Sequence, residues 1–266
     1  MAPSLLPEDR RQGIVGYYLE RPLVMAHRGA KDVAPENTLA AFRAAVDLGA
    51  DAIELDVTRC ATGDIVVIHD DTVDRTTGGT GRVDAMPLEA LRSLDAGSWF
   101  GPAYSGERIP LLSEVLEAVG GRIRLNIEIK LQRPGSQPIE AELAAMLRQR
   151  GLVADTIVSS FVPGALWRLR RVAPDIARAL LYSRDMPVGL RHAWPRFWLS
   201  PQALNPHFTI VDERYIHHAR LAGYRVNVWT ANKEPDIERM MSLGVDAVIT
   251  DHVGRAREVL ERLGLS

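Results

Sequence analysis

Short apolar segments alternate with longer amphipathic segments along most of this 266-residue chain. The strand-like segments span residues 23–27, 52–57, 123–130, 156–161, 176–183, 203–208, 224–230 and 246–251. Between most of them lie stretches with apolar residues at helical spacing and a glycine near the end, such as 37–50 and 137–151. About eight βα units in a chain close to the ~250 residues typical of the fold predict an α/β protein, a (β/α)8 TIM barrel.

A doubly wound open sheet is the alternative, because the same alternation of strands and helices would serve it. Against it, the first strand is not followed by a GxGxxG turn. Residues 71–110 interrupt the alternation and are rich in Gly, Asp, Thr and Pro, with one short helical piece. We therefore expect one domain over residues 1–266, with a small insertion at about 71–110 after the second strand, at one end of the barrel.

Composition excludes several classes of protein. A net charge of -2 and a pI near 6.4 give no electrostatic case for a nucleic-acid partner. The single cysteine, Cys60, excludes an intramolecular disulfide and a cysteine-rich zinc site. No segment approaches the ~18 uninterrupted apolar residues of a membrane span, and residues 1–12 do not resemble a secretory signal. We expect a cytoplasmic protein without integral membrane association; the oligomeric state stays open.

Carboxylates recur on one face of two predicted strands. Glu54 and Asp56 are two residues apart, so both side chains project to the same side of their strand. Glu128 and Lys130 do the same near the end of a later strand. Barrel enzymes place their sites at the carboxyl ends of the strands, and hard divalent cations prefer carboxylate oxygens. The pattern indicates a metal site beside an anion site, although a buried Glu128–Lys130 ion pair is an open alternative.

Two histidines fall near these carboxylates in the predicted barrel. His27 and Arg28 come directly after the first strand, where the chain turns into a glycine. His69 ends a third strand-like run, and a hairpin turn at 62–64 would return it toward the same end of the barrel. Two imidazoles beside a metal and an arginine suit acid/base chemistry at a phosphate ester.

These motifs together resemble a known family. The segments HRGAKDVAPENTLAAF, GADAIELDV, VVIHDDTVDRTTGGTG, IPLLSEVL, LNIEIK, VNVWT and GVDAVITD are similar to the motif series of the glycerophosphodiester phosphodiesterase family, in the family's order. The resemblance runs from about residue 22 to 260. It implies a (β/α)8 barrel with an insertion after the second strand. The activity that it implies is metal-dependent hydrolysis of glycerophosphodiesters to glycerol 3-phosphate and an alcohol.

The resemblance also implies one divalent cation, Mg²⁺ or Ca²⁺, and a small-molecule phosphodiester substrate. It further implies roles for individual residues. By motif position, the implied metal ligands are Glu54, Asp56 and Glu128, the acid/base pair is His27 and His69, and the phosphate-binding cations are Arg28 and Lys130. We take His27 as the base and His69 as the acid. Supporting roles fall to Glu36, which would orient Arg28, and to Asn37, for which a helix N-cap is an equally good account. We expect Trp229 either to line the glycerol side of the pocket or to be a partly buried aromatic residue at a strand end.

Two rival functions fit the same sequence. A lysophospholipase D-like hydrolase would use the same chemistry on lysophospholipids, with Trp99, Phe100 and Tyr104 of the insertion as an acyl-chain lip. A non-catalytic phosphate-binding barrel is the more distant alternative, and retention of all seven implied ligand, acid/base and phosphate-binding residues argues against it. The stretch 184–202 fits either a helix packed on the barrel or part of its rim. The alcohol that leaves, and the choice between direct water attack and a cyclic phosphate intermediate, stay open.

Overall fold

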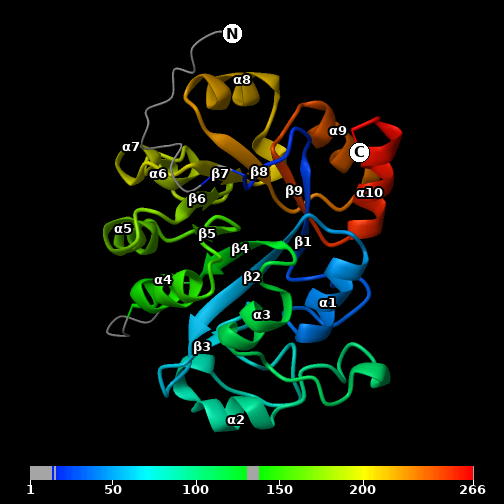
Figure 1. The fold of residues 1–266 in the computed structure, drawn as a ribbon, viewed down its shortest axis with the longest axis vertical. Helices are drawn as coiled ribbons and strands as arrows, with labels where there is room; N and C mark the ends of the chain where they lie inside the picture. Colours follow the sequence, from blue (N-terminus) through cyan, green and yellow to red (C-terminus); the bar gives the residue numbers. More distant parts are fainter. Residues whose placement is uncertain (1–13, 15, 131–137, 266) are drawn as a thin grey trace.

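Eight parallel strands close into a barrel in the computed structural model, which describes residue 14 and residues 16–130 and 138–265 (Figure 1). The first strand pairs with both the second and the last, which closes the sheet and rules out the open-sheet alternative. The TIM barrel prediction is confirmed, and each predicted barrel strand is present. The strands are β1 (Leu23–His27), β2 (Ala52–Arg59), β4 (Arg124–Ile129), β5 (Thr156–Ser160), β6 (Ala177–Tyr182), β7 (Ala203–Pro206), β8 (Arg225–Val228) and β9 (Ala247–Thr250).

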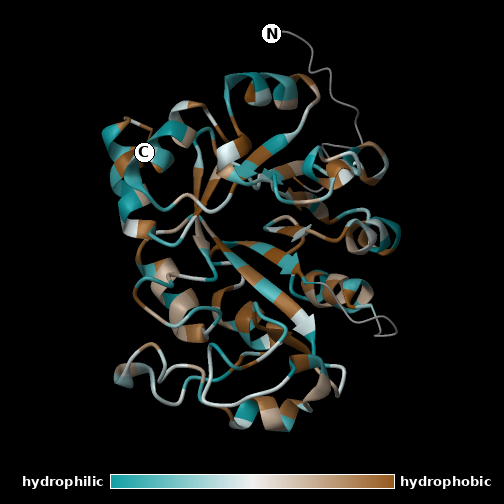
Figure 2. Cartoon of the chain, turned by 180° about the vertical axis from the view of Figure 1, so that it is seen from behind, coloured by the Kyte–Doolittle hydropathy of each residue, from teal (hydrophilic) through white to brown (hydrophobic). Residues whose placement is uncertain are grey.

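Helices surround the barrel and pack their apolar sides on the strands, with hydrophilic residues frequent on the outside (Figure 2). The full-length helices are α1 (Leu39–Asp47), α3 (Leu112–Val119), α4 (Glu140–Gln149), α5 (Pro163–Val172), α8 (Glu213–Leu221), α9 (Glu234–Ser242) and α10 (Val253–Arg262). Residues 184–202 contain two short helices, α6 (Val188–Arg191) and α7 (Arg196–Leu199), and α7 contacts α5 on the flank of the barrel. No helix in the described ranges has both the length and the apolar content needed to cross a membrane.

Small apolar side chains fill the interior of the barrel. Inward positions such as Ala52, Ala177 and Ala203 belong to this inner core, together with Leu23 and Met25 of β1. Before β1, the segment described from residue 16 adds the fully buried Tyr17, whose hydroxyl donates to the carbonyl oxygen of Leu125 at 3.2 Å. Since Leu125 lies at the start of β4, Tyr17 fills the amino-terminal end of the barrel. The predicted acidic residues lie toward the opposite, carboxyl end of β2 and β4.

The insertion is a small substructure attached to the end of β2 (Figure 1). The strand β2 continues past its neighbours, and its residues 57–59 pair antiparallel with β3 (Ile65–Val67), as the predicted hairpin requires. After β3 come short 3-10 helices at Val83–Ala85 and Pro102–Tyr104 and the helix α2 (Leu88–Ser93). A separate apolar cluster that includes Cys60, Val66, Leu91 and Ile109 holds the insertion together. This substructure places the segment after β3 beside the mouth of the barrel.

Candidate active site

Strand register gathers the predicted acidic residues at the carboxyl end of the barrel. Glu54 of β2 is level with His27 on one side and with Asn126 of β4 on the other, and Asp56 is level with Glu128. Because alternate residues of a strand point the same way, all of these side chains project into the barrel. Parallel pairing of three neighbouring strands thus brings together groups that lie far apart in the sequence.

The three predicted metal ligands form one cluster. Glu54, Asp56 and Glu128 each offer a carboxylate oxygen, and these oxygens all lie within 4.8 Å of one another. All three residues are buried, with 5%, 1% and 7% of their surface exposed. Lys130 places its Nζ 2.8 Å from Glu128 Oε1 and 3.4 Å from Asp56 Oδ1, and Arg28 Nε lies 3.4 Å from Asp56 Oδ2. Three buried carboxylates beside two cations keep a surplus of negative charge, so this donor set can hold one divalent cation.

The charge surplus shows in the pKa values. Burial and the neighbouring carboxylates raise the pKa of Glu54 well above its usual value, and burial and Asp56 raise the pKa of Glu128 to about 7. Burial also acts to raise the pKa of Asp56, but Lys130 and Arg28 outweigh it and hold that pKa below its ordinary value. In the absence of a cation, the cluster favours keeping protons on Glu54 and Glu128.

The metal-free protein is accordingly expected to lose stability as the pH rises. Glu54 and Glu128 bind protons more tightly in the folded chain than in the unfolded chain. The free energy of unfolding therefore falls as the pH rises from 4.5, the ordinary pKa of a glutamate, through about 7, the pKa of Glu128 in the folded chain. For Glu128 alone, the loss amounts to at most about 3 kcal/mol. Urea unfolding at pH 5 and pH 8, in chelator and in saturating Mg²⁺, measures it. Stabilisation by Mg²⁺ that is no larger at pH 8 than at pH 5 would contradict the cluster as the ligand set.

The turn after β1 explains why a histidine, an arginine and a glycine follow a buried strand. Arg28 has φ 58°, and its backbone N–H donates to Glu54 Oε2 at 3.1 Å. Gly29 has φ 83°, and a Cβ there would meet the backbone of Ala41 in α1 at 2.8–2.9 Å, so no side chain fits. The strained conformation of Arg28 turns its guanidinium back over the carboxylates, as is common at functional sites.

The Pro-Glu-Asn-Thr segment supports this turn. Asn37 also has a positive φ, 56°, and its side-chain amide donates to Asp56 Oδ2 at 2.9 Å. Its backbone N–H donates to the carbonyl of Arg28 at 2.9 Å. The N-cap of α1 is Thr38, whose hydroxyl accepts from the Ala41 N–H, so the helix-cap account of Asn37 is wrong. Asn37 instead joins the turn to the carboxylate cluster.

His27 is held by a carboxylate that directly follows the last strand. Its Nδ1 lies 2.6 Å from Asp251 Oδ1, and its Nε2 lies 4.0 Å from Glu54 Oε2. Burial acts to raise the pKa of Asp251, but the hydrogen bond with His27 and the nearby Lys31 lower it to about 2. Asn232 donates to the other oxygen of Asp251 at 2.7 Å. An ionised Asp251 only accepts, so His27 donates from Nδ1 and directs Nε2 toward the carboxylates.

His69 is held by a second network, which reaches Arg28. Its Nδ1 lies 2.6 Å from Asp70 Oδ1, and Arg75 of the insertion donates to both oxygens of Asp70 at 2.7 and 3.1 Å. Arg75 also makes a two-pronged contact with Glu36 at 2.7 and 2.8 Å. Glu36 in turn accepts from Arg28 at 2.9 Å. Burial acts to raise the pKa of Glu36, but Arg75 and Arg28 lower it to about 2, so the chain of alternating charges stays ionised.

A cavity of about 100 Å³ opens between the two histidines and the carboxylates. Trp229 lines it and donates from its indole nitrogen to the carbonyl of Asn205 at 2.8 Å. The ring of Trp229 meets those of Phe161 and His207 edge to face, with centroids 5.2 and 5.0 Å apart. Two lining residues, Asn126 and Ser159, carry buried side-chain atoms without a hydrogen-bond partner in the described part of the chain. The cavity thus has an aromatic side and unsatisfied polar groups.

Several of these residues were not predicted from the sequence. Asp251, Phe161 and His207 each lie two positions beyond an inward-facing residue and inside the predicted strand-like segments, so strand alternation would have indicated them. Arg75 lies in irregular structure, and no periodicity points to it. The rings of Trp99, Phe100 and Tyr104 pack edge to face on one another and do not line this cavity.

Fold and site together define a class of protein: a (β/α)8 barrel whose carboxyl end combines a cluster of three buried carboxylates that could hold a metal ion, two oriented histidines, and an arginine and a lysine beside them. The model of the glycerophosphoryl diester phosphodiesterase family matches residues 27–255. A glycerophosphodiester phosphodiesterase of Caldanaerobacter subterraneus subsp. tengcongensis is 40% identical over 236 residues, covering 87% of this chain and 94% of that protein. The chain therefore belongs to the glycerophosphodiester phosphodiesterase family, as its motifs predicted.

Solved structures agree with this assignment. A glycerophosphodiester phosphodiesterase from Agrobacterium tumefaciens matches with a TM-score of 0.78 and 31% identity, covering 89% of this chain and 99% of that one. A phosphodiesterase from Oleispira antarctica, solved in complex with the product sn-glycerol-3-phosphate, matches with a TM-score of 0.80 and 33% identity, covering 91% of this chain and 97% of that one.

Proposed function

We propose that this protein hydrolyses glycerophosphodiesters to glycerol 3-phosphate and an alcohol, with one divalent cation at Glu54, Asp56 and Glu128. The observation that carries the proposal is the cluster of three buried carboxylates within 4.8 Å, flanked by Arg28 and Lys130. The complex of the Oleispira antarctica protein with sn-glycerol-3-phosphate supports the same class of small-molecule substrate. All-oxygen ligation suits Mg²⁺ or Ca²⁺ better than zinc.

Charge stabilisation is the first task of the site. A bound divalent cation would act as a Lewis acid on the phosphoryl oxygens and neutralise charge there. Arg28 and Lys130 lie beside the same cluster, so they can bind the remaining phosphoryl oxygens as negative charge builds up in the transition state. Asn37 and Glu36 hold Asp56 and Arg28 in place through the hydrogen bonds described above.

His27 is the proposed general base. Burial lowers its pKa against the opposing effect of Asp251, so the ring is neutral at neutral pH and can take a proton on Nε2. Asp251 keeps the opposite nitrogen protonated and stabilises the imidazolium that forms. The proton comes from water or from a glycerol hydroxyl, and the latter gives a cyclic phosphate. Single-turnover hydrolysis in ¹⁸O-water separates the two, because direct attack places label in the product without a trappable cyclic species.

His69 is the proposed general acid for the departing alcohol. Its Nδ1 is occupied by Asp70, which leaves Nε2 as the nitrogen that can donate. Burial lowers the pKa of His69 in the free protein. A phosphodiester anion beside the ring favours the imidazolium, so substrate binding supplies the charged form that the step requires.

Metal-dependent release of glycerol 3-phosphate tests the proposed function directly. Purified protein is incubated with glycerophosphocholine in Mg²⁺, in Ca²⁺ and in excess chelator. We expect release with at least one of the two ions and none in chelator, because charge neutralisation at the phosphoryl group depends on the cation. Full activity in chelator would contradict the metal-dependent mechanism.

The same assay separates the lysophospholipase D-like alternative. We expect glycerophosphocholine to be hydrolysed with a higher kcat/KM than lysophosphatidylcholine, since the aromatic rings of the insertion do not line the described cavity at the barrel mouth. A clear preference for the lysophospholipid would instead favour the alternative.

Arg75 is expected to act as a positioning residue for both Arg28 and His69. Arg75→Ala removes the cation between Glu36 and Asp70, and we expect kcat to fall by about 10- to 100-fold, the range for partners that orient functional groups. Asp70 then loses a compensating charge, so the pKa of His69 rises and its limb of the pH–kcat profile moves to higher pH. Kinetics as a function of pH measure both effects.

Two comparisons accompany this variant. Arg75→Lys keeps the charge but loses the two-pronged geometry, so it should recover only part of kcat. Arg82→Ala removes another exposed arginine of the insertion, paired with Asp84, and should leave the profile unchanged. An unshifted profile in Arg75→Ala would show that Arg75 has only a structural role.

Because Arg75 would join the insertion to the site, we propose that the barrel and the insertion form one functional domain. The cytoplasmic location of the protein stays a prediction.

A further inference from the structure

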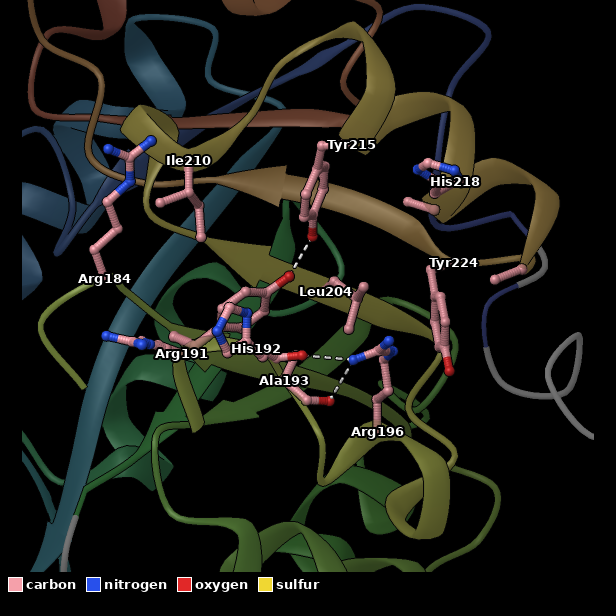
Figure 3. A pocket seen from close by; sticks show the side chains of 13 residues that line it. Arg184, Arg191, His192, Ala193, Arg196, Leu204, Ile210, Tyr215, His218 and Tyr224 are labelled. Atoms are coloured by element: carbon pink, nitrogen blue, oxygen red, sulfur yellow. Dashed lines mark hydrogen bonds between the residues drawn. The ribbon is translucent and has the colours of Figure 1, made fainter. Parts of the chain in front are cut away.

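A second, larger cavity lies on the flank of the barrel, between the α6–α7 segment and α8 (Figure 3). Its volume is about 580 Å³. It shares no lining residue with the cavity at the barrel mouth. Its size falls within the range of pockets that bind small molecules. We call it the flank groove.

The flank groove exists because the fifth connection of the barrel, between β6 and β7, is short of helix. Here α6 and α7 have four residues each, whereas α5 and α8 on either side have ten and nine. Two short helices cannot cover the outer faces of β6 and β7 as a full helix would. Tyr182 of β6 and Leu204 of β7 therefore line the groove.

The floor of the flank groove is apolar and aromatic. Besides Tyr182 and Leu204, it includes Tyr224 and Ala219, and each of these four side chains has at most 5% of its surface exposed. The hydroxyls of Tyr182 and Tyr215 hydrogen-bond to each other, and a dashed line from the Tyr215 hydroxyl marks this bond in Figure 3. That hydrogen bond satisfies polar atoms at the floor, so the floor offers mainly hydrocarbon and ring surface to a ligand.

Cationic side chains line the same groove. Arg184, Arg191 and Arg196 belong to its lining, and no carboxylate does. None of these three arginines forms an ion pair with a residue in the described part of the chain, unlike Arg75 and Arg148. Arg196 is held in place by hydrogen bonds to the carbonyl oxygens of His192 and Ala193 at 2.6 and 2.9 Å (Figure 3). The groove therefore combines a hydrophobic floor with unneutralised positive charge.

We propose that the flank groove binds a single-chain amphiphilic anion, with the apolar chain on the tyrosine and leucine floor and a phosphate or carboxylate head at the arginines. The arginines of the lining carry the charge opposite to that of such a head, and a single guanidinium can bind a phosphate or carboxylate with planar, two-pronged geometry. A neutral amphiphile would leave the charges uncompensated, and a simple anion would leave the floor bare. The proposal is independent of the chemistry at the barrel mouth.

Calorimetric titration with decyl phosphate, below its micelle concentration, tests the proposal on the full chain. We expect saturable binding of one molecule per chain, at least about tenfold tighter than binding of inorganic phosphate or of decyl maltoside. Arg191→Glu should weaken binding by at least about tenfold because it reverses one charge of the groove. The matched control is Arg122→Glu, a charge reversal at another exposed arginine, which lies after α3. It should leave the affinity within about twofold.

A variant that fills the flank groove and competition by glycerol 3-phosphate test where decyl phosphate binds. Ala219→Phe places a ring in the groove and should abolish decyl phosphate binding while leaving glycerophosphocholine hydrolysis within about twofold of the parent. A charge variant that keeps the floor, Arg191→Glu, covers the case in which Ala219→Phe does not fold. Absence of saturable binding would overturn the proposal. Binding that glycerol 3-phosphate displaces, binding that persists in Arg191→Glu, or uptake only onto anionic vesicles would overturn it equally.

Discussion

Glu54→Gln is expected to lower kcat/KM by about 100- to 1000-fold, because the loss of one carboxylate removes several kcal/mol of cation-dependent charge stabilisation. The substitution keeps the shape of the side chain and removes only its charge. Glu54 is buried among Asp56 and Glu128, which repel it and raise its pKa. The same variant should therefore make the metal-free protein more stable at pH 8. A fall in kcat/KM together with a gain in the stability of the metal-free protein distinguishes this prediction.

Three measurements check this prediction: kinetics in saturating Mg²⁺, calorimetric titration of the stripped protein with Mg²⁺, and thermal unfolding in chelator. Glu258→Gln is the matched control, since Glu258 is exposed on α10 and far along the chain from the cluster. It should change none of the three readings. A Glu54→Gln protein with the parent's metal affinity and activity would remove Glu54 from the ligand set.

His69→Ala is expected to lower kcat/KM on glycerophosphocholine by about 10²- to 10⁴-fold, the usual contribution of a general acid. The loss should shrink strongly on a glycerophosphodiester of 4-nitrophenol, because that alcohol leaves without being protonated. His27→Ala should lose activity on both substrates to a similar extent, because the nucleophile still has to give up its proton. The ratio between the two substrates therefore reports which histidine serves which end of the reaction.

The reverse pattern would exchange the two roles. If His27→Ala rather than His69→Ala were rescued by the better leaving group, His27 would be the acid and Asp251 would orient the acid instead of the base. Equal losses on both substrates for both variants would count against an acid/base pair. His217→Ala is a suitable control, because this exposed histidine of α8 contacts neither histidine of the site.

The strand pattern was sufficient to predict the barrel and much of the candidate site. Apolar runs bounded by glycine-terminated helices predicted all eight barrel strands, because the burial of both sheet faces leaves a strong signal. Strand alternation alone placed Glu54 with Asp56, and Glu128 with Lys130, on one face of each strand. Register then brings Lys130 within ion-pair distance of Asp56 and Glu128. Local geometry carries this information, so no tertiary contact was needed to expect it.

The hydrogen-bond partners of the candidate catalytic residues could not be predicted from the sequence in the same way. Asp251 is 224 residues from His27, and only closure of the barrel through the β1–β9 pairing brings the two side chains to 2.6 Å. Arg75 joins Glu36 to Asp70 from an insertion without periodicity, where the position of a side chain depends on the small separate core around Leu91. The left-handed turn at Arg28 likewise depends on the close approach of α1 to Gly29.

By itself, the sequence determined the family, the barrel and the carboxylates that meet at its mouth, because periodicity, motif order and strand alternation are local properties of the chain. Only the tertiary structure decided how His27 and His69 are oriented, how Arg75 connects the insertion to Arg28, and where two four-residue helices leave a cationic groove open on the flank. These features depend on contacts between segments that are distant in the chain, and such contacts exist only once the sheet has closed and the helices have packed on it.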